Sequence, residues 1–460
     1  MKIANISNVY SNSINSKRNN DLKNGFKSCE NFNEFSKNSS NAIKNNAIAS
    51  INFKGDDSQK IKEIELKLCE EYGIDAKFTN LATAKLTLEA VEDFVELNDK
   101  KMFEGLNIKP YEDERDWVWG TSSDYNTNEF TLKLNNNFSM QEFKNHAQKN
   151  YDNCYTPSSN PKYDFYLALA EFLCFKYNPY AYTTNTRIKN FSNSFLEVAN
   201  KLGANATANF ARFNSTYIAS RMCGVEIPPD SKRYYLGNVG AKLNLPPAKI
   251  TKSSFDENID FKTIDEAVEY LKQYGIEAEF ENLKLANLTA NAIKDFIEIN
   301  KNPKMFEGLK ISGYIKDSTT TIGCMHWKYN HETGKYSSKI EFNKAYDWNR
   351  HKNTALRNYF SGHFSSANEK YSIYHELAHW LDFNSRPKEY VQDNNDFASG
   401  KLIINSFGKR AYSTISGYAT ENSLEFVAEY VAARMCGQKF SKSVNDEYKY
   451  ETNLELKFPE

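Results

Sequence analysis

The sequence predicts an α+β protein made of two homologous domains, each with a small sheet and several helices. The first observation is an internal repeat, because short motifs recur in the same order at nearly the same spacing in the two halves. The second is that helical periodicity and short runs of period two alternate in the same order in both halves. The repeated pairs are Tyr72-Gly73-Ile74-Asp75-Ala76 with Tyr274-Gly275-Ile276-Glu277-Ala278, Met102-Phe103-Glu104-Gly105-Leu106 with Met305-Phe306-Glu307-Gly308-Leu309, and Arg-Met-Cys-Gly at 221–224 and again at 434–437.

The repeat and the local composition divide the chain into four segments. Residues 1–57 are rich in Asn, Ser and Lys and poor in periodic apolar positions, so this N-terminal segment is predicted to be disordered. Residues 58–228 and 259–460 are the two homologous domains. Residues 229–258 contain Pro246 and Pro247 and are predicted to form a linker.

Both domains are expected to follow one plan. A first helix leads to a short strand near 76–78 or 278–280, and a second helix ends near the Met-Phe-Glu-Gly-Leu motif. Strands of period two follow, at 130–134 in the first domain and around Ile340 and Phe342 in the second. Two longer helical segments then close each domain.

The segment 366–383 carries the clearest functional motif. Ser366-x-x-Glu369 matches a capping box, and apolar residues follow it at helical spacing. In a helix, His375 and His379 lie one turn apart on one face, as two ligands of one tetrahedral zinc do. Glu376 lies beside them, where it could accept a proton from a water at the metal. The apolar positions are Ile373, Leu377, Trp380 and Leu381.

A catalytic zinc needs a third protein ligand, and a downstream helix offers two candidates. Asn422 is a suitable N-cap and Gly437 a suitable C-cap for this helix. Glu425 and Glu429 lie one turn apart between them, and a glutamate on this face would complete a His-His-Glu site. The alternative is that both are solvated helix carboxylates.

The stretch from Tyr418 to Glu429 resembles the catalytic domain of anthrax lethal factor and its relatives, which are gluzincin zinc metallopeptidases. In that family a tyrosine follows the HExxH motif and precedes the third zinc ligand, a glutamate, by the separation that Tyr418 and Glu425 have here. The family's continuation is kept as Glu425-Phe426-Val427-Ala428-Glu429. The resemblance covers residues 371–436. It implies a zincin-like second domain, with Glu425 as the ligand and Tyr418 as the hydroxyl that stabilises the oxyanion.

Together these residues predict a zinc-dependent endopeptidase that binds one Zn²⁺ per chain in its C-terminal domain. Zinc held by His375, His379 and Glu425 would make its water more acidic, with Glu376 as proton acceptor and Tyr418 as the oxyanion donor. Asp382 and Glu429 are candidate partners for the free ring N–H groups of the two ligand histidines. The other histidines of this domain, His326, His331, His351 and His363, are expected at surface or core positions.

The first domain has lost this chemistry. Aligned by the repeat, Leu167, Ala168 and Glu171 stand where the second domain has His375, Glu376 and His379. Arg212 falls at the position of Glu425, and Asn205 at that of Tyr418. The apolar frame at Phe165, Leu169 and Leu173 is kept. The first domain is therefore predicted to be a pseudopeptidase with a role in folding or in recognising a substrate or delivery partner.

Charge and composition exclude several classes. The 58 basic and 59 acidic residues argue against nucleic-acid binding, and no apolar run is long enough to span a membrane. The seven cysteines contain no CxxC pair, and the N-terminus lacks the apolar core of a secretory signal. The localisation is left open between the cytoplasm and export without a classical signal, as for a secreted toxin or effector.

Two other functions stay open at this point. One is a zinc-containing binding protein without peptidase activity, and the other is a prophage-associated maturation peptidase with the same chemistry. An intact Glu376 and Tyr418 argue against the first, because structural zinc needs neither residue.

Overall fold

The computed structural model describes most of the chain beyond its N-terminal segment. The residues described are 55–459 except 112–117, 125–126, 128, 179–192, 204–205, 207–208, 240–242, 248–257, 315–322, 344–347 and 400–405. The predicted disordered segment 1–57 therefore lies outside the described residues, apart from the three that begin the first helix. Residues Gln59–Glu460 form one compact unit.

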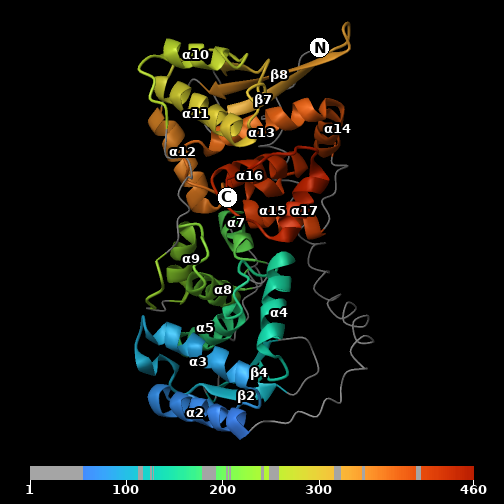
Figure 1. Ribbon diagram of the computed structural model, residues 1–460. Coiled ribbons are helices and arrows are strands. Elements are labelled where there is room, and N and C mark those ends of the chain that lie inside the picture. Colours follow the sequence, from blue (N-terminus) through green and yellow to red (C-terminus); the bar gives the residue numbers. More distant parts are fainter. Residues whose placement is uncertain are drawn as a thin grey trace, which may run out of the picture. The chain divides into compact units, whose positions relative to one another are not determined.

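Each half contains a four-stranded mixed sheet with the same strand order (Figure 1). The first sheet has the order β1 (Asp75–Ala76), β2 (Asn107–Tyr111), β4 (Glu129–Asn135) and β3 (Trp119–Asp124). The second has the order β5 (Glu277–Ala278), β6 (Lys310–Tyr314), β8 (Lys335–Asn343) and β7 (Gly323–Asn330). In both sheets the first three strands are parallel and the last is antiparallel.

The register of the two sheets matches at corresponding positions. Ile108 pairs with Leu132 in the first sheet, and Ile311 pairs with Ile340 in the second. All four side chains are buried, which follows from the period-two pattern seen in the sequence. The α+β class is therefore confirmed.

Each half begins with a helix, and most of its helices follow the last strand. The first half contains α2 (Gly55–Tyr72), α3 (Leu81–Val95), η3 (Lys100–Phe103), α4 (Met140–Asp152), α5 (Tyr163–Tyr177), α7 (Asn193–Lys201), α8 (Phe210–Met222) and α9 (Asp230–Val239). The second contains α10 (Ile264–Lys272), α11 (Leu283–Asn300), α12 (Trp348–Ser361), α13 (Tyr371–Ser385), α14 (Pro387–Ala398), α15 (Ser406–Ile415), η5 (Tyr418–Thr420), α16 (Ser423–Met435) and α17 (Lys442–Glu451). Helix α9 lies within the segment 229–258 that was predicted as a linker.

The two repeated motifs at the start of each half contact each other. Gly73 and Gly275 have φ values of +68° and +73°, a conformation that favours glycine. The amide of Gly105 donates to the carbonyl of Gly73 at 3.1 Å, and Gly308 donates to Gly275 at 2.9 Å. This contact brings the short first strand beside the second, and it explains why the two motifs recur together.

Each half has its own hydrophobic core. The first core is formed by residues between Ile61 and Tyr235, and the second largely by residues between Leu271 and Tyr448. In the first half α5 packs against α8, β3 and β4. In the second half α13 packs in the same way against α16, β7 and β8. These two helix pairs carry the residues of the predicted site and the residues that the sequence repeat aligns with them.

The predicted capping box before α13 is wrong. The helix begins at Tyr371 with Lys370 at the N-cap position and no side-chain cap, and Ser366 Oγ instead accepts a hydrogen bond from Asn368 N at 3.1 Å. The buried ammonium of Lys370 binds Asp295, which also accepts a hydrogen bond from Tyr374. This buried ion pair fixes the first turn of the helix.

The same arrangement precedes α5. Lys162 pairs with Asp93, and Tyr166 donates to the same carboxylate. The two helices therefore start alike although only one of them carries histidines.

Candidate metal centre

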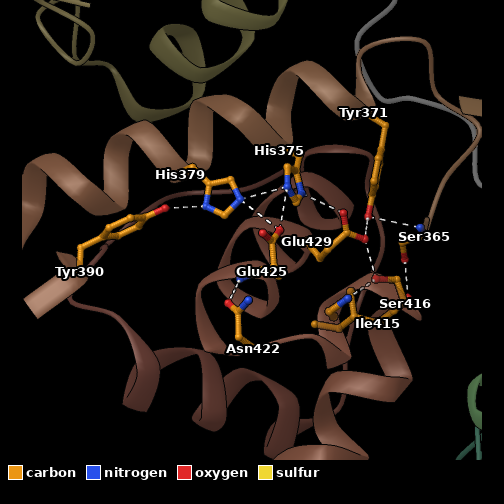
Figure 2. Close-up of polar contacts among 11 residues, drawn as sticks. Ser365, Tyr371, His375, His379, Tyr390, Ile415, Ser416, Asn422, Glu425 and Glu429 are labelled. Atoms are coloured by element: carbon orange, nitrogen blue, oxygen red, sulfur yellow. Dashed lines mark hydrogen bonds and ion pairs between the residues drawn. The ribbon is translucent and has the colours of Figure 1, made fainter. Parts of the chain in front are cut away.

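Helices α13 and α16 bring three potential metal ligands together (Figure 2). His375 Nε2 lies 3.0 Å from His379 Nε2, and Glu425 Oε2 lies 3.1 Å from the first and 3.2 Å from the second. Both histidines are buried and Glu425 is half-buried. Among the residues that the structure describes, this is the one group of three His, Cys, Asp or Glu side chains close enough to share a metal ion.

The spacing of these three atoms fits a small tetrahedral ion. An ion with bonds of about 2.0–2.1 Å at the tetrahedral angle holds its ligand atoms about 3.3 Å apart. The three observed separations are slightly shorter and nearly equal. A metal ion therefore fits above the triangle after a small outward movement of the side chains.

The local structure of α16 sets the position of Glu425. Asn422 is the N-cap, and its side-chain oxygen accepts a hydrogen bond from Glu425 N at 2.9 Å. The cap fixes the first turn of the helix, so that Glu425 faces α13. The N-cap predicted from the sequence is confirmed.

Glu429 lies one turn further along α16 and contacts the other side of the His375 ring. Its Oε1 is 2.9 Å from His375 Nδ1, and the carboxylate is fully buried. Tyr371 and Ser416 donate hydrogen bonds to its second oxygen at 2.7 and 2.5 Å. A carboxylate at Nδ1 holds the imidazole in the tautomer that leaves Nε2 free to bind a metal.

His379 has a different partner from the one expected. Its Nδ1 lies 3.1 Å from the hydroxyl of Tyr390, a buried residue of α14. Asp382 is instead bound by Arg386, at 2.8 and 2.9 Å, and by the hydroxyl of Thr452. Its carboxylate charge is therefore used to hold the end of α13 and not to orient an imidazole.

Glu376 is buried beneath the edge strand β7. Burial raises the pKa of its carboxyl group, while the charges of His375 and His379 and a backbone hydrogen bond from Met325 lower it. A Cβ added at Gly323 would lie 3.3 Å from Glu376 Cγ and 3.0 Å from a Phe342 ring carbon. The absence of a side chain at Gly323 leaves room for the carboxylate beside the metal ligands.

Tyr418 lies against the His375 ring. The two rings stack with centroids 5.4 Å apart, and the His363 ring lies 4.9 Å from Tyr418. Burial raises the pKa of Tyr418 well above its usual value, and the charges of Glu425 and Glu376 raise it further. The hydroxyl therefore keeps its proton and can donate a hydrogen bond.

The charged groups of the site shift one another's pKa values. Burial lowers the pKa of His375, but Glu425 and Glu429 outweigh it and raise that pKa well above its usual value. Burial likewise raises the pKa of Glu425, and the two histidines outweigh it and lower that pKa. Both shifts favour the charged forms of His375 and Glu425, and metal binding by such ligands is coupled to the release of protons.

The first half holds an ion pair where the second half holds the metal ligands. Glu171 lies at the position of His379, and its Oε1 is 3.2 Å from Arg212 Nη1, at the position of Glu425. Ser215 also donates to Glu171 at 3.0 Å, and the guanidinium of Arg212 lies over the Trp119 ring at 4.9 Å. By sheet register Trp119 corresponds to Gly323, so the first half has an aromatic side chain where the second half has none. Asn205, aligned with Tyr418, lies outside the described residues.

Comparison of the chain with protein-family models, with curated proteins and with solved structures gives no match. A function is therefore assigned from the contacts among the residues of the candidate metal centre. No described helix is both long and apolar enough to cross a membrane.

Several residues that shape the site carried no usable signal in the sequence. Tyr390 lies in a polar helix, and nothing local indicates that it contacts His379. Tyr371 recurs as Tyr163 in the half without metal ligands, so its recurrence does not indicate a contact with the site. Gly323 would have been found only from the sheet register.

Proposed function

We propose that this chain is a zinc-dependent endopeptidase whose catalytic domain is the segment 259–460. The observation that carries the proposal is the triangle of His375 Nε2, His379 Nε2 and Glu425 Oε2 with Glu376 beside it. Two imidazoles and one carboxylate are a common ligand set of catalytic zinc, which keeps a further position for water or substrate. A structural zinc site is usually closed by four protein ligands.

Zinc bound at these residues supplies a Lewis acid that polarises a carbonyl group and makes water more acidic. Glu376 accepts the proton of the attacking water and passes it to the leaving amine. Its burial and raised pKa suit this role, since a base with a pKa closer to neutrality can both take and return a proton. Tyr418 donates its hydroxyl hydrogen to the oxygen that gains negative charge.

The substrate is a protein or peptide that lies extended beside β7. This strand is at one edge of the second sheet, and Gly323 and Met325 of β7 lie next to Glu376. An edge strand binds an extended peptide by main-chain hydrogen bonds, which places a peptide bond near the metal ligands without requiring a particular side chain. Selection of one protein substrate would then come from contacts outside the site.

The first half is a non-catalytic copy of the same domain. The shared sheet order, the shared helix starts at Lys162 and Lys370, and the shared N-caps at Asn209 and Asn422 support a duplication. Its Glu171–Arg212 ion pair occupies the place of the metal ligands. Recognition of the substrate or of a delivery partner is the role that we assign to its surface, and a secreted toxin or effector is the setting that such a two-part enzyme fits.

The proposal is tested with the full chain, loaded with one equivalent of Zn²⁺, on denatured casein and on a peptide library. The wild type is expected to cleave, and Glu376→Gln is expected to keep the metal and lose at least about 10²-fold in rate, because only the proton acceptor is removed. Glu389→Gln is the control, since it makes the same chemical change at an exposed carboxylate of the neighbouring helix α14. Full activity of Glu376→Gln would remove this residue from the mechanism, and an inactive zinc-loaded wild type would refute the proposed function.

A further inference from the structure

A short loop, residues 362–365, links the metal centre to the first half of the chain. On its inner side the loop holds Tyr418, because Tyr418 N donates to His363 O at 3.1 Å and the His363 ring contacts the tyrosine ring. The loop also holds Tyr371, because Ser365 N donates to the Tyr371 hydroxyl at 3.3 Å. Tyr371 in turn donates to Glu429, the carboxylate at His375 (Figure 2).

The outer side of the same loop contacts the first half. Lys201, the last residue of α7, donates from Nζ to Ser365 Oγ at 3.4 Å. A Cβ added at Gly362 would lie 3.1 Å from Pro228 Cγ and 3.7 Å from Val198 Cα. Gly362 has a φ of +79°, so this turn needs a glycine, and its open face is filled by residues of the other half.

Further contacts surround this point. Tyr359, in the helix that precedes the loop, donates to Glu226 at 3.1 Å. Helix α7 packs against α12 and α15, and α9 packs against α12. The loop is thus enclosed between the first half and the residues that orient His375 and Tyr418.

The environment of Lys201 fits a supporting role. Desolvation lowers the pKa of its ammonium group to about 8, although the charges of Glu226 and Glu429 raise it. Ser365 Oγ lies 2.9 Å from the Ile415 carbonyl oxygen and 2.7 Å from Gln438 Oε1, and its single hydrogen is donated to these acceptors. A lone pair of the same oxygen accepts from the ammonium. The lysine therefore acts through the Ser365 hydroxyl, and the charge of Glu429 favours the ammonium form of Lys201.

We propose that the first half is an internal support of the metal centre, with Lys201 as a positioning residue that acts through Ser365 on Tyr371, Glu429 and His375. This inference rests on the proposed function and adds to it a task for the degenerate copy. The copy is then required for turnover of short peptides as well as for recognition of a whole protein. The first half lacks the metal ligands but keeps this contact with the loop.

The test uses the full chain with Lys201→Met, Lys201→Arg and, as a control, Lys272→Met, which changes a lysine that is 71% exposed on α10. The zinc Kd is measured by competition with a chelator, and kcat and KM with a short peptide. Direct partners of ligand histidines change metal affinity by about 10–100-fold, so for this more remote residue we expect a Kd weaker by about three- to tenfold in Lys201→Met. The kcat should fall by a similar factor at unchanged KM, with recovery in Lys201→Arg and no change in Lys272→Met.

An unchanged zinc Kd and unchanged kcat in folded Lys201→Met would overturn the inference. If Lys201→Met does not fold, Tyr359→Phe is the second variant to test. It removes the hydrogen bond from Tyr359 to Glu226, which also joins the two halves beside the loop, and changes the side chain little in shape. A twofold or larger rise in its zinc Kd supports the inference, and wild-type affinity and turnover refute it. The zinc Kd does not depend on hydrolysis, so a wild type that binds zinc and cleaves nothing would refute the proposed function alone.

Discussion

The two members of the Glu171–Arg212 ion pair are expected to contribute unequally to the stability of the first half, because they are buried to different extents. Glu171 has a side chain only 2% exposed, whereas that of Arg212 is 35% exposed. Arg212→Met keeps most of the packing on Trp119 but removes the cation from a buried carboxylate, to which the Ser215 hydroxyl also donates a hydrogen bond. Removal of one member of a buried pair costs about 3–5 kcal/mol, and we expect the lower end because Arg212 is partly solvated.

The opposite change should be milder. Glu171→Gln leaves a neutral amide in the buried position and a guanidinium that water can reach. The loss is that of a hydrogen bond to a charged group, about 1.5–3 kcal/mol, and we expect the lower end because Arg212 stays solvated. For a domain of this size about 1 kcal/mol shifts the melting temperature by roughly 2–4 °C. Arg212→Met should therefore lower the melting temperature of the first half by roughly 6–12 °C, and Glu171→Gln by roughly half of that.

The assay is calorimetry of the full chain, with the zinc content of each variant measured in parallel. The double variant Glu171→Leu/Arg212→Met should be more stable than Arg212→Met alone, because no charge is left buried. If Arg212→Met were no more damaging than Glu171→Gln, Glu171 would not be a buried charge that needs Arg212. The interpretation of this pair as the replacement for a metal would then be refuted.

Three further expectations follow from the contacts of the metal centre. Tyr418→Phe should bind zinc normally but lose about 10²–10³ in kcat, the usual effect of deleting one oxyanion donor, as measured by peptide hydrolysis. Tyr390→Phe removes the hydroxyl at His379 Nδ1 and should weaken zinc by about tenfold in a chelator titration; unchanged affinity would show that the hydroxyl does not orient the ring. Gly323→Ala places a Cβ against Phe342 and Glu376 and should lower kcat by about tenfold at unchanged zinc affinity, since small displacements of a reacting group are costly; full activity would show that the Glu376 carboxylate has room to move.

The sequence was informative wherever the determining interactions are local. The spacing of His375 and His379 on one helix face depends only on helix geometry, and the N-cap at Asn422 depends on the next three residues. The repeat predicted one plan for both halves, and the two sheets have the same strand order. The strand patterns at 130–134 and at Ile340 and Phe342 were readable because each sheet buries one face.

The missed features depend on contacts between distant segments. Tyr390 meets His379 only because α14 folds back on α13, and Arg386 rather than an imidazole takes Asp382. The start of α13 is set by the buried Lys370–Asp295 pair, so a good capping pattern at Ser366 was not used. Tertiary packing decided each of these cases.

The link from Lys201 to the metal centre also depends on a contact between segments that are distant in the sequence. It joins α7 of one half to a loop of the other, and neither segment has a distinctive motif. A lysine near a helix end reads as a solvated surface residue in any sequence. Only the packing of the two halves shows that Lys201 contacts the hydroxyl of Ser365.

The most direct test of the zinc site is the metal content of the purified chain and of its ligand variants, measured by inductively coupled plasma mass spectrometry. The wild type is expected to hold one zinc per chain and the His375→Ala/His379→Ala variant none. Glu429→Ala should weaken zinc by about 10–100-fold, and Glu425→Ala should weaken it more, because it removes a ligand itself. Absence of zinc from a wild type supplied with the metal, two zinc ions per chain, or a site emptied by Glu429→Ala but not by Glu425→Ala would contradict the assignment.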